Sequence, residues 1–259
     1  MSATTEALVL RFVDFGESDR IVHLLTPDQG RVAAIAKGAR RSRKRFPGTL
    51  DLFNHLHVQF ARPGRRRPTG MRRLEVAKLE RIFLAPRRDL GCFALACYLL
   101  ELLDRAAPEG GRSGDLERLF RFALEALSHL EVGGADRRLR VLYELRALDA
   151  LGFRPEFANC VRCGREALEG APAGAYPRFL VAEGGALCEA CQRPQDGAIA
   201  LRRGTLRTLS QALELPVGAL RRLALSGEML DEADRLVRHF QHFHLGLELR
   251  SQSFVDRLS

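Results

Sequence analysis

The sequence predicts an α+β chain of several domains, in which a small N-terminal β-barrel precedes an α-helical domain that a four-cysteine module interrupts. Short runs of alternating apolar and polar residues occupy the first 82 residues. After Pro86 the apolar period changes to that of helices, and two Cys-x-x-Cys pairs then interrupt the helical part. We therefore expect domains at 1–82, at 83–154 with 197–259, and at 155–196.

The N-terminal region reads as five short strands separated by turns. In the clearest of them Leu56, Val58 and Phe60 alternate with His55 and His57, which we expect to face solvent. Five strands in so short a segment suit a small closed barrel of the OB-fold type, and an SH3-like barrel fits the periodicity nearly as well. The expected strands are 7–13, 21–25, 31–37, one around 56–60, and 71–79.

Positive charge is concentrated in the same region. Residues 1–85 hold 17 Lys and Arg against 8 Asp and Glu, whereas the remaining residues hold 24 of each, so the net charge of +9 arises entirely from the first third. Such an asymmetry predicts an N-terminal module that binds nucleic acid or another anionic surface.

Two basic clusters account for most of this excess. Residues 37–45, which we call the basic loop, carry six cations in nine residues, and a second basic turn follows at 62–68. A solvated loop is the alternative interpretation of such a run. The candidate DNA-binding residues are Lys37, Arg40, Arg41, Arg43, Lys44, Arg45, Arg65, Arg66 and Arg67.

Four helices are expected from apolar stripes of helical period, at 90–103, 115–130, 136–151 and 229–249. Asp115 and Asp136 are candidate N-caps, and Phe243 is among the residues expected to face inward. The longest uncharged apolar stretch, 90–100, is too short to span a bilayer, and the first residues do not resemble a secretory signal. We expect a cytoplasmic protein with no membrane partner and with reduced cysteines.

Four of the six cysteines form a metal-ligand pattern. Cys160-x-x-Cys163 and Cys188-x-x-Cys191 are separated by 24 residues, with an expected hairpin strand at 176–182 between them. Two such pairs complete a tetrahedral set of thiolates, the ligands that a structural Zn²⁺ prefers, and leave no open position for a substrate. The sequence therefore predicts one structural Zn²⁺ and no catalytic residue.

An enzymatic interpretation competes with this one. His129-Leu-Glu131 upstream of Cys160-x-x-Cys163 is similar to the zinc deaminase layout, in which Glu131 would transfer protons. However, Asn159 stands where that layout has proline, the second cysteine pair would have no role, and His129 fits a helix surface. His239, His242 and His244 lack further ligands at suitable spacing, and no Gly-rich phosphate loop is present.

Several patches of the sequence are distinctive in their order. They are residues 15–22 (FGESDRIV), 30–40, 151–155 (LGFRP) leading into 160–164, Gly184-Gly185 before Cys188, and 249–251. In this order they resemble the RecO family of DNA repair and recombination proteins, and the likeness extends over essentially the full length.

The resemblance implies an N-terminal OB-fold, a helical domain and a zinc module. It also implies a nucleoid-associated, non-enzymatic mediator that binds single- and double-stranded DNA and anneals complementary strands. The partners implied are RecR, single-strand binding protein and, indirectly, RecA. An RNA-binding zinc-ribbon protein is a further alternative, because OB barrels bind both nucleic acids.

Overall fold

The computed structural model describes residues 4–42, 44–61, 71–169 and 176–258. It divides into two compact units, Met1–Ala135 with Leu249–Ser259, and Asp136–Glu248. The first unit holds a closed barrel and the second holds the four paired cysteines. The finer division at 1–82, 83–154 with 197–259, and 155–196 stays a prediction.

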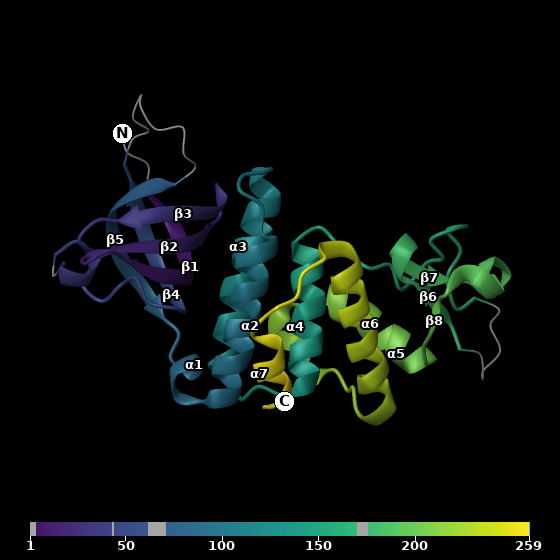
Figure 1. Ribbon diagram of the computed structural model, residues 1–259. Helices are drawn as coiled ribbons and strands as arrows, with labels where there is room; N and C mark the ends of the chain where they lie inside the picture. The colour runs from purple at the N-terminus through teal and green to yellow at the C-terminus, as the bar shows by residue number, and fades with distance from the viewer. Residues whose placement is uncertain (1–3, 43, 62–70, 170–175, 259) are drawn as a thin grey trace. The chain divides into compact units, whose positions relative to one another are not determined.

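Five strands close into a barrel in the first unit (Figure 1). Their order is β1-β2-β3-β5-β4, with β4 pairing back onto β1, and only β3 and β5 run parallel. The long β1 pairs with β4 through its first half and with β2 through its second, around an irregularity between Val9 and Arg11. The predicted barrel of OB type is confirmed. The strands are β1 (Thr4–Phe15), β2 (Asp19–Thr26), β3 (Gly30–Ala36), β4 (Asn54–Phe60) and β5 (Arg72–Ile82).

Alternate residues of the strands fill the barrel, as the sequence pattern predicts. On β4 the side chains of Leu56, Val58 and Phe60 are buried in this core. Phe46 and Leu50, from the connection between β3 and β4, are buried with them and close the core. The segment after the basic loop is thereby anchored in the barrel.

The expectation that His55 faces solvent is wrong. Its ring is buried, lies 5.8 Å from the ring of Phe120 on α3 (Ser113–Leu130), and bonds Glu6 Oε2 at 2.9 Å. The outer face of β4 is covered at this point by a helix that the alternation of a single strand does not reveal.

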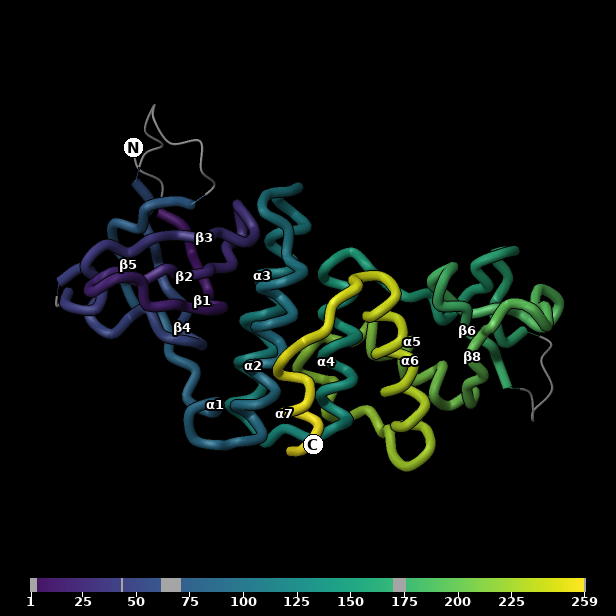
Figure 2. Tube along the Cα trace, in the orientation of Figure 1, coloured from purple at the N-terminus to yellow at the C-terminus, as the bar shows by residue number. Residues whose placement is uncertain are grey.

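Helices complete the first unit. Asp89 caps α2 (Leu90–Ala106) by accepting a hydrogen bond from Cys92 N at 2.7 Å, and α1 (Ala85–Arg88) precedes it. The C-terminal α7 (Gln252–Asp256) packs against α2 (Figures 1 and 2). Helix α3 begins at Ser113 without a side-chain cap, so the expected capping role of Asp115 is wrong.

Three longer helices lie in the described part of the second unit: α4 (Arg137–Ala150), α5 (Arg203–Glu214) and α6 (Gly227–Leu245). Asp136 caps α4 as predicted, accepting from Leu139 N at 2.6 Å. Helix α5 was not predicted, and Phe243, expected to face inward, is 59% exposed near the end of α6. None of the described helices is long and apolar enough to cross a lipid bilayer.

A buried ionic cluster joins α4 to α6. The Asp234 carboxylate on α6 accepts hydrogen bonds from Arg238 Nε at 2.6 Å, from Arg137 Nη2 at 2.8 Å and from Arg140. Arg140 is fully buried and also donates to Glu144 at 3.1 Å. A buried carboxylate is tolerated here because several guanidinium groups surround it.

A small sheet supports the cysteine segment. Strand β6 (Arg178–Leu180) pairs antiparallel with β7 (Gly185–Leu187) and with β8 (Ile199–Ala200). The expected hairpin strand at 176–182 is thus confirmed in a shorter form. The β6–β7 turn brings Cys188, just after β7, back toward the first cysteine pair.

Candidate nucleic-acid interface and metal centre

The basic loop leaves the barrel at Gly38. This glycine has a φ of 67°, which turns the chain out of β3 into a short 3₁₀ helix, Ala39–Arg41. Arg40 N donates to Ser18 O at 3.0 Å, and the Arg40 guanidinium reaches the carbonyls of Gly16 and Glu17 at 3.4 Å. The start of the loop is therefore held against the β1–β2 turn.

Three of the predicted DNA-binding residues are engaged within the barrel. Lys37 pairs with Asp19, Arg40 Nε lies 3.4 Å from Asp14 Oδ2, and Arg45 Nη2 donates to Lys37 O at 2.7 Å. The hydrogen bond from Lys37, with a second from Gly38 N, lowers the pKa of Asp19. Part of the charge in this loop thus orders the loop itself.

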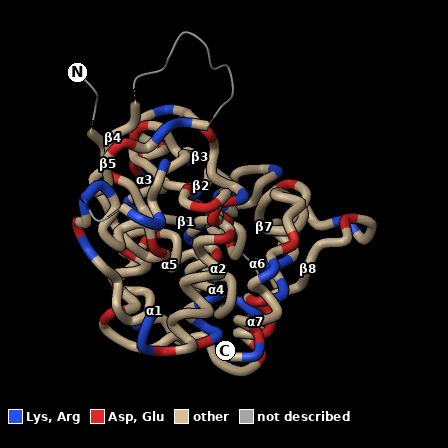
Figure 3. The backbone as a smooth tube through the Cα atoms, turned by 60° about the vertical axis from the view of Figure 1, so that its left-hand side comes forward, with Lys and Arg blue, Asp and Glu red and all other residues tan. Residues whose placement is uncertain are grey.

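Arg41 and Lys44 differ from these three residues. Both are exposed, and neither forms an ion pair with any residue that the structure describes. Their charges are available to an external anion. Arg43, Arg65, Arg66 and Arg67 lie outside the described residues, and their assignment stays a prediction. Figure 3 shows basic and acidic residues interspersed along the backbone of the barrel.

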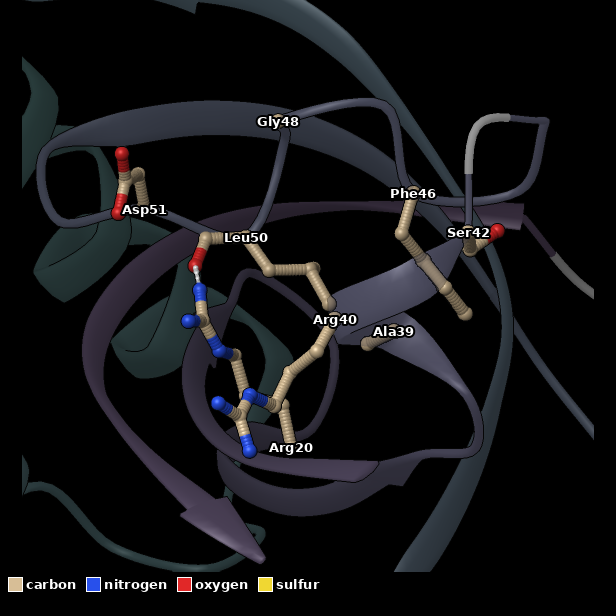
Figure 4. A pocket seen from close by; sticks show the side chains of 8 residues that line it. All are labelled: Arg20, Ala39, Arg40, Ser42, Phe46, Gly48, Leu50 and Asp51. Carbon is tan, nitrogen blue, oxygen red and sulfur yellow. Dashed lines mark hydrogen bonds between the residues drawn. The ribbon is translucent and has the colours of Figure 1, made fainter. Parts of the chain in front are cut away.

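A cavity of about 300 Å³ opens beside the basic loop, between β2 and the connection that leads to β4 (Figure 4). Ala39, Phe46 and Leu50 supply apolar lining, and Arg20 and Arg40 contribute guanidinium groups. Sequence reasoning missed Arg20, because it stands alone in a strand and outside both basic clusters.

The aromatic residues of the barrel are mostly inaccessible. Phe46, Phe53 and Phe60 are buried, whereas Phe15, at the end of β1, is 52% exposed. Phe12 is half-buried beneath Arg20, whose guanidinium carbon lies 4.0 Å from its ring centroid. The described part of the barrel therefore does not present the row of exposed rings on which single-strand binders stack successive bases.

The second candidate site consists of Cys160, Cys163, Cys188 and Cys191, whose sulfur atoms all lie within 4.8 Å of one another. Cys163 Sγ and Cys188 Sγ are 3.6 Å apart. A tetrahedral zinc ion with Zn–S bonds of about 2.3 Å requires its sulfurs to be roughly 3.8 Å apart. The four side chains therefore fit one such ion.

Backbone hydrogen bonds shape the first cysteine pair. Gly164 N donates to Cys160 O at 2.8 Å, and Cys160 N donates to Arg165 O at 2.7 Å. Hydrogen bonds from Arg165 lower the pKa of Cys163 to about 6. Hydrogen bonds with the neighbouring sulfurs raise the pKa of Cys191 to about 12, and the hydrogen bond with Cys163 contributes most to this rise. Four thiolates this close need a cation among them to ionise together.

Arg162, between the cysteines of the first pair, ties the two pairs together. Its guanidinium donates to Cys191 O at 2.7 Å, to Asp196 at 2.9 Å and to Glu183 at 2.9 Å. These carboxylates raise its pKa, Asp196 most. The role of Arg162 was not evident from sequence, because its partners lie 21 to 34 residues away.

Comparison with known proteins places the chain in one family. The N-terminal model of recombination protein O matches residues 1–83, and its C-terminal model matches residues 87–253. The chain belongs to the recombination protein O family. A protein of Symbiobacterium thermophilum named DNA repair protein RecO is 36% identical over 256 residues, covering 98% of this chain and 96% of that protein.

Further relatives of the same name agree with this membership. The DNA repair protein RecO of Anaeromyxobacter dehalogenans strain 2CP-1 is 35% identical over 257 residues, with 99% of this chain and 96% of the relative covered. That of Geobacter sulfurreducens is 35% identical over 254 residues, with 98% and 97% covered. The predicted resemblance to the RecO family is confirmed.

The deaminase alternative gains no support from this RecO-family structure. Glu131 Oε1 accepts a hydrogen bond from Ala85 N at 2.7 Å, so its carboxylate is engaged near α1. His129, expected on a helix surface, is buried instead. Among the described residues, the four cysteines form the one cluster of three or more side chains able to hold a metal, and no histidine belongs to it.

Proposed function

We propose that this chain is a non-enzymatic DNA repair and recombination mediator that binds single- and double-stranded DNA and anneals complementary strands. Membership of the recombination protein O family supports the repair role. The observation that carries the DNA-binding part is the exposure of Arg41 and Lys44, without ion-pair partners among the described residues, on a loop of an OB-type barrel.

The physical task of annealing fits these residues. Two strands repel through their phosphates, and cations that neutralise part of this charge let the strands approach while their base edges stay free to pair. Arg41 and Lys44 are exposed and can neutralise phosphates in this way. Arg43, Arg45 and Arg65–Arg67 would supply cations for further phosphates. Such a mechanism needs neither a nucleotide nor covalent chemistry.

The four-cysteine site would hold one structural Zn²⁺. Its four thiolates fill a tetrahedral shell, so the ion would join the two Cys-x-x-Cys turns and would not meet a substrate. The small apolar cluster around it, with Leu180 and Leu187, is too small to fix these turns alone. Zinc would therefore act on the stability of the second unit.

The proposed partners are RecR and single-strand binding protein, with recombinase RecA loaded indirectly on strands coated with single-strand binding protein. They are proposed from the family resemblance, and we assign no residue to them. The protein would act in the cytoplasm, in association with the nucleoid.

A strand-annealing assay without nucleotide tests the proposal. We expect the purified chain to accelerate pairing of complementary DNA strands at low salt, and to bind DNA of unrelated sequences with similar affinity. Matched RNA strands measure whether DNA is preferred. Absence of acceleration at any salt concentration, or annealing that depends on ATP, would contradict the proposal.

A further inference from the structure

The lining of the cavity beside the basic loop contains apolar side chains as well as cations, and contacts with DNA phosphates do not account for the apolar part. Its lining combines the apolar side chains of Ala39, Phe46 and Leu50 with the guanidinium groups of Arg20 and Arg40 (Figure 4). Phe46 and Leu50 are each 3% exposed and belong to the barrel core, so this wall is rigid.

Arg20 is fixed in place before any ligand arrives. Its Nε donates to Asp14 at 2.9 Å, its Nη1 donates to Leu50 O at 2.9 Å, and one side of the guanidinium lies over the Phe12 ring at 4.0 Å. A guanidinium held in this way is a flat, positively charged platform, and ordering a ligand against it costs little side-chain entropy.

The charges of the cavity argue against a phosphate as its occupant. Arg20 and Arg40 both pair with Asp14, and the carboxylate of Asp51 also lies in the lining. An anion entering the cavity would meet the Asp51 carboxylate, and the two guanidinium groups there are already paired with Asp14. A neutral planar heterocycle can instead contact the apolar wall and the guanidinium platform, and its polar edge can hydrogen-bond Asp51 or Ser42.

We infer that this cavity holds one unstacked base of a single DNA strand whose phosphates follow the basic loop. The inference rests on the proposed DNA binding. Ala39 and Arg40 line the cavity, and Arg41 follows them in the same 3₁₀ helix, so a strand bound by Arg41 passes beside the opening. Because the bases of an intact duplex stay stacked, the cavity binds a base of single strands only. The cations of the basic loop bind the phosphates of both single- and double-stranded DNA.

Two variants of one residue test the cavity without changing any charge. Ala39→Leu adds bulk to the lining, whereas Ala39→Ser leaves the cavity open. The probes are a 12-nucleotide thymidine strand, an abasic strand of the same length, and a duplex of 12 base pairs. We expect wild-type protein to bind the thymidine strand roughly tenfold more tightly than the abasic strand, as one stacked base would provide. Ala39→Leu should abolish this ratio while keeping affinity for the abasic strand and the duplex, and Ala39→Ser should keep the ratio.

A Phe15→Ala variant distinguishes the cavity from the exposed ring at the end of β1, and its ratio of affinities for the thymidine and abasic strands should match that of wild type. Equal affinity of wild-type protein for the thymidine and abasic strands overturns the inference, and so does a ratio lost in Phe15→Ala but kept in Ala39→Leu. The wild-type comparison needs no variant to fold. Failure of wild-type protein to bind any of the three probes would instead contradict the proposed function.

Discussion

Arg162 donates a hydrogen bond to the carbonyl oxygen of Cys191 at 2.7 Å, and so joins the first cysteine pair to the second. The same guanidinium binds Asp196 and Glu183. Partners around a metal site orient its ligands and commonly change metal affinity by tenfold or more. We expect Arg162→Ala to weaken zinc binding by roughly tenfold, measured by competition with a chromophoric chelator. Arg207→Ala, at an exposed position on α5, is the control and should bind zinc as wild type does. Equal zinc affinity in the two variants would show that Arg162 has no such role.

One Zn²⁺ per chain should copurify with the protein. Cys163→Ala leaves three ligands, and we expect loss of the metal and of soluble yield. Cys92→Ala and Cys97→Ala, which remove thiols of α2 outside the four-cysteine site, should keep the metal. Elemental analysis of the purified proteins measures this. Wild-type protein that is folded and free of metal would rule out the zinc assignment.

DNA binding should depend steeply on salt and little on sequence. If about five phosphates are neutralised on a single strand, the logarithm of affinity should fall with the logarithm of salt concentration at a slope of roughly −3.5. Arg41→Ala removes one uncompensated charge and should make the slope shallower by about 0.7. Fluorescence anisotropy over a salt series measures both slopes, and a flat dependence would argue against phosphate contacts.

The second unit should lose stability in acid. Burial would raise the pKa of Asp234, but hydrogen bonds from Arg238 and Arg140 lower it to about 2. Because this folded-state pKa lies below the unfolded value of 3.8, the carboxylate contributes its full stability above about pH 4 and loses it as the pH falls toward 2. The contribution is about 2 kcal/mol.

Thermal melting as a function of pH measures this contribution. Asp234→Asn should be less stable than wild type at pH 7, and the difference in free energy of unfolding should shrink between pH 4 and pH 2. A difference that stays constant over this range would mean that Asp234 does not titrate as proposed.

The features set by local pattern could be predicted from sequence. Strand alternation located the barrel, and the two Cys-x-x-Cys pairs located the four-cysteine cluster, because each strand and each cysteine pair is recognised within a few consecutive residues. What sequence missed depends on contacts between distant segments. Arg20 lines the cavity only because β2 and the segment at Leu50 are brought together in the barrel. His55 is buried because α3 lies against β4.

The sequence also could not rank the cations of the basic loop. Six neighbouring positive charges are equivalent in a linear pattern, but folding pairs Lys37 with Asp19 and Arg40 with Asp14. Among the described residues, Arg41 and Lys44 are the exposed cations of the basic loop that neither pair with a carboxylate nor hold the loop in place. Reversing the charge of Arg40 would break its ion pair with Asp14 in the barrel. Variants that test DNA binding should therefore leave Arg40 unchanged.

The rate of DNA annealing per folded molecule tests the central claim most directly. Arg41→Glu with Lys44→Glu turns two attractions for phosphate into repulsions at exposed positions, where substitutions usually change the free energy of unfolding by less than about 0.5 kcal/mol. Arg207→Glu with Arg235→Glu makes the same change of charge at exposed positions of the second unit. We predict that the loop variant loses annealing and DNA binding while its melting temperature stays near that of wild type, and that the control variant anneals normally. Annealing by the loop variant at the wild-type rate would contradict the account and show that the basic loop is only solvated.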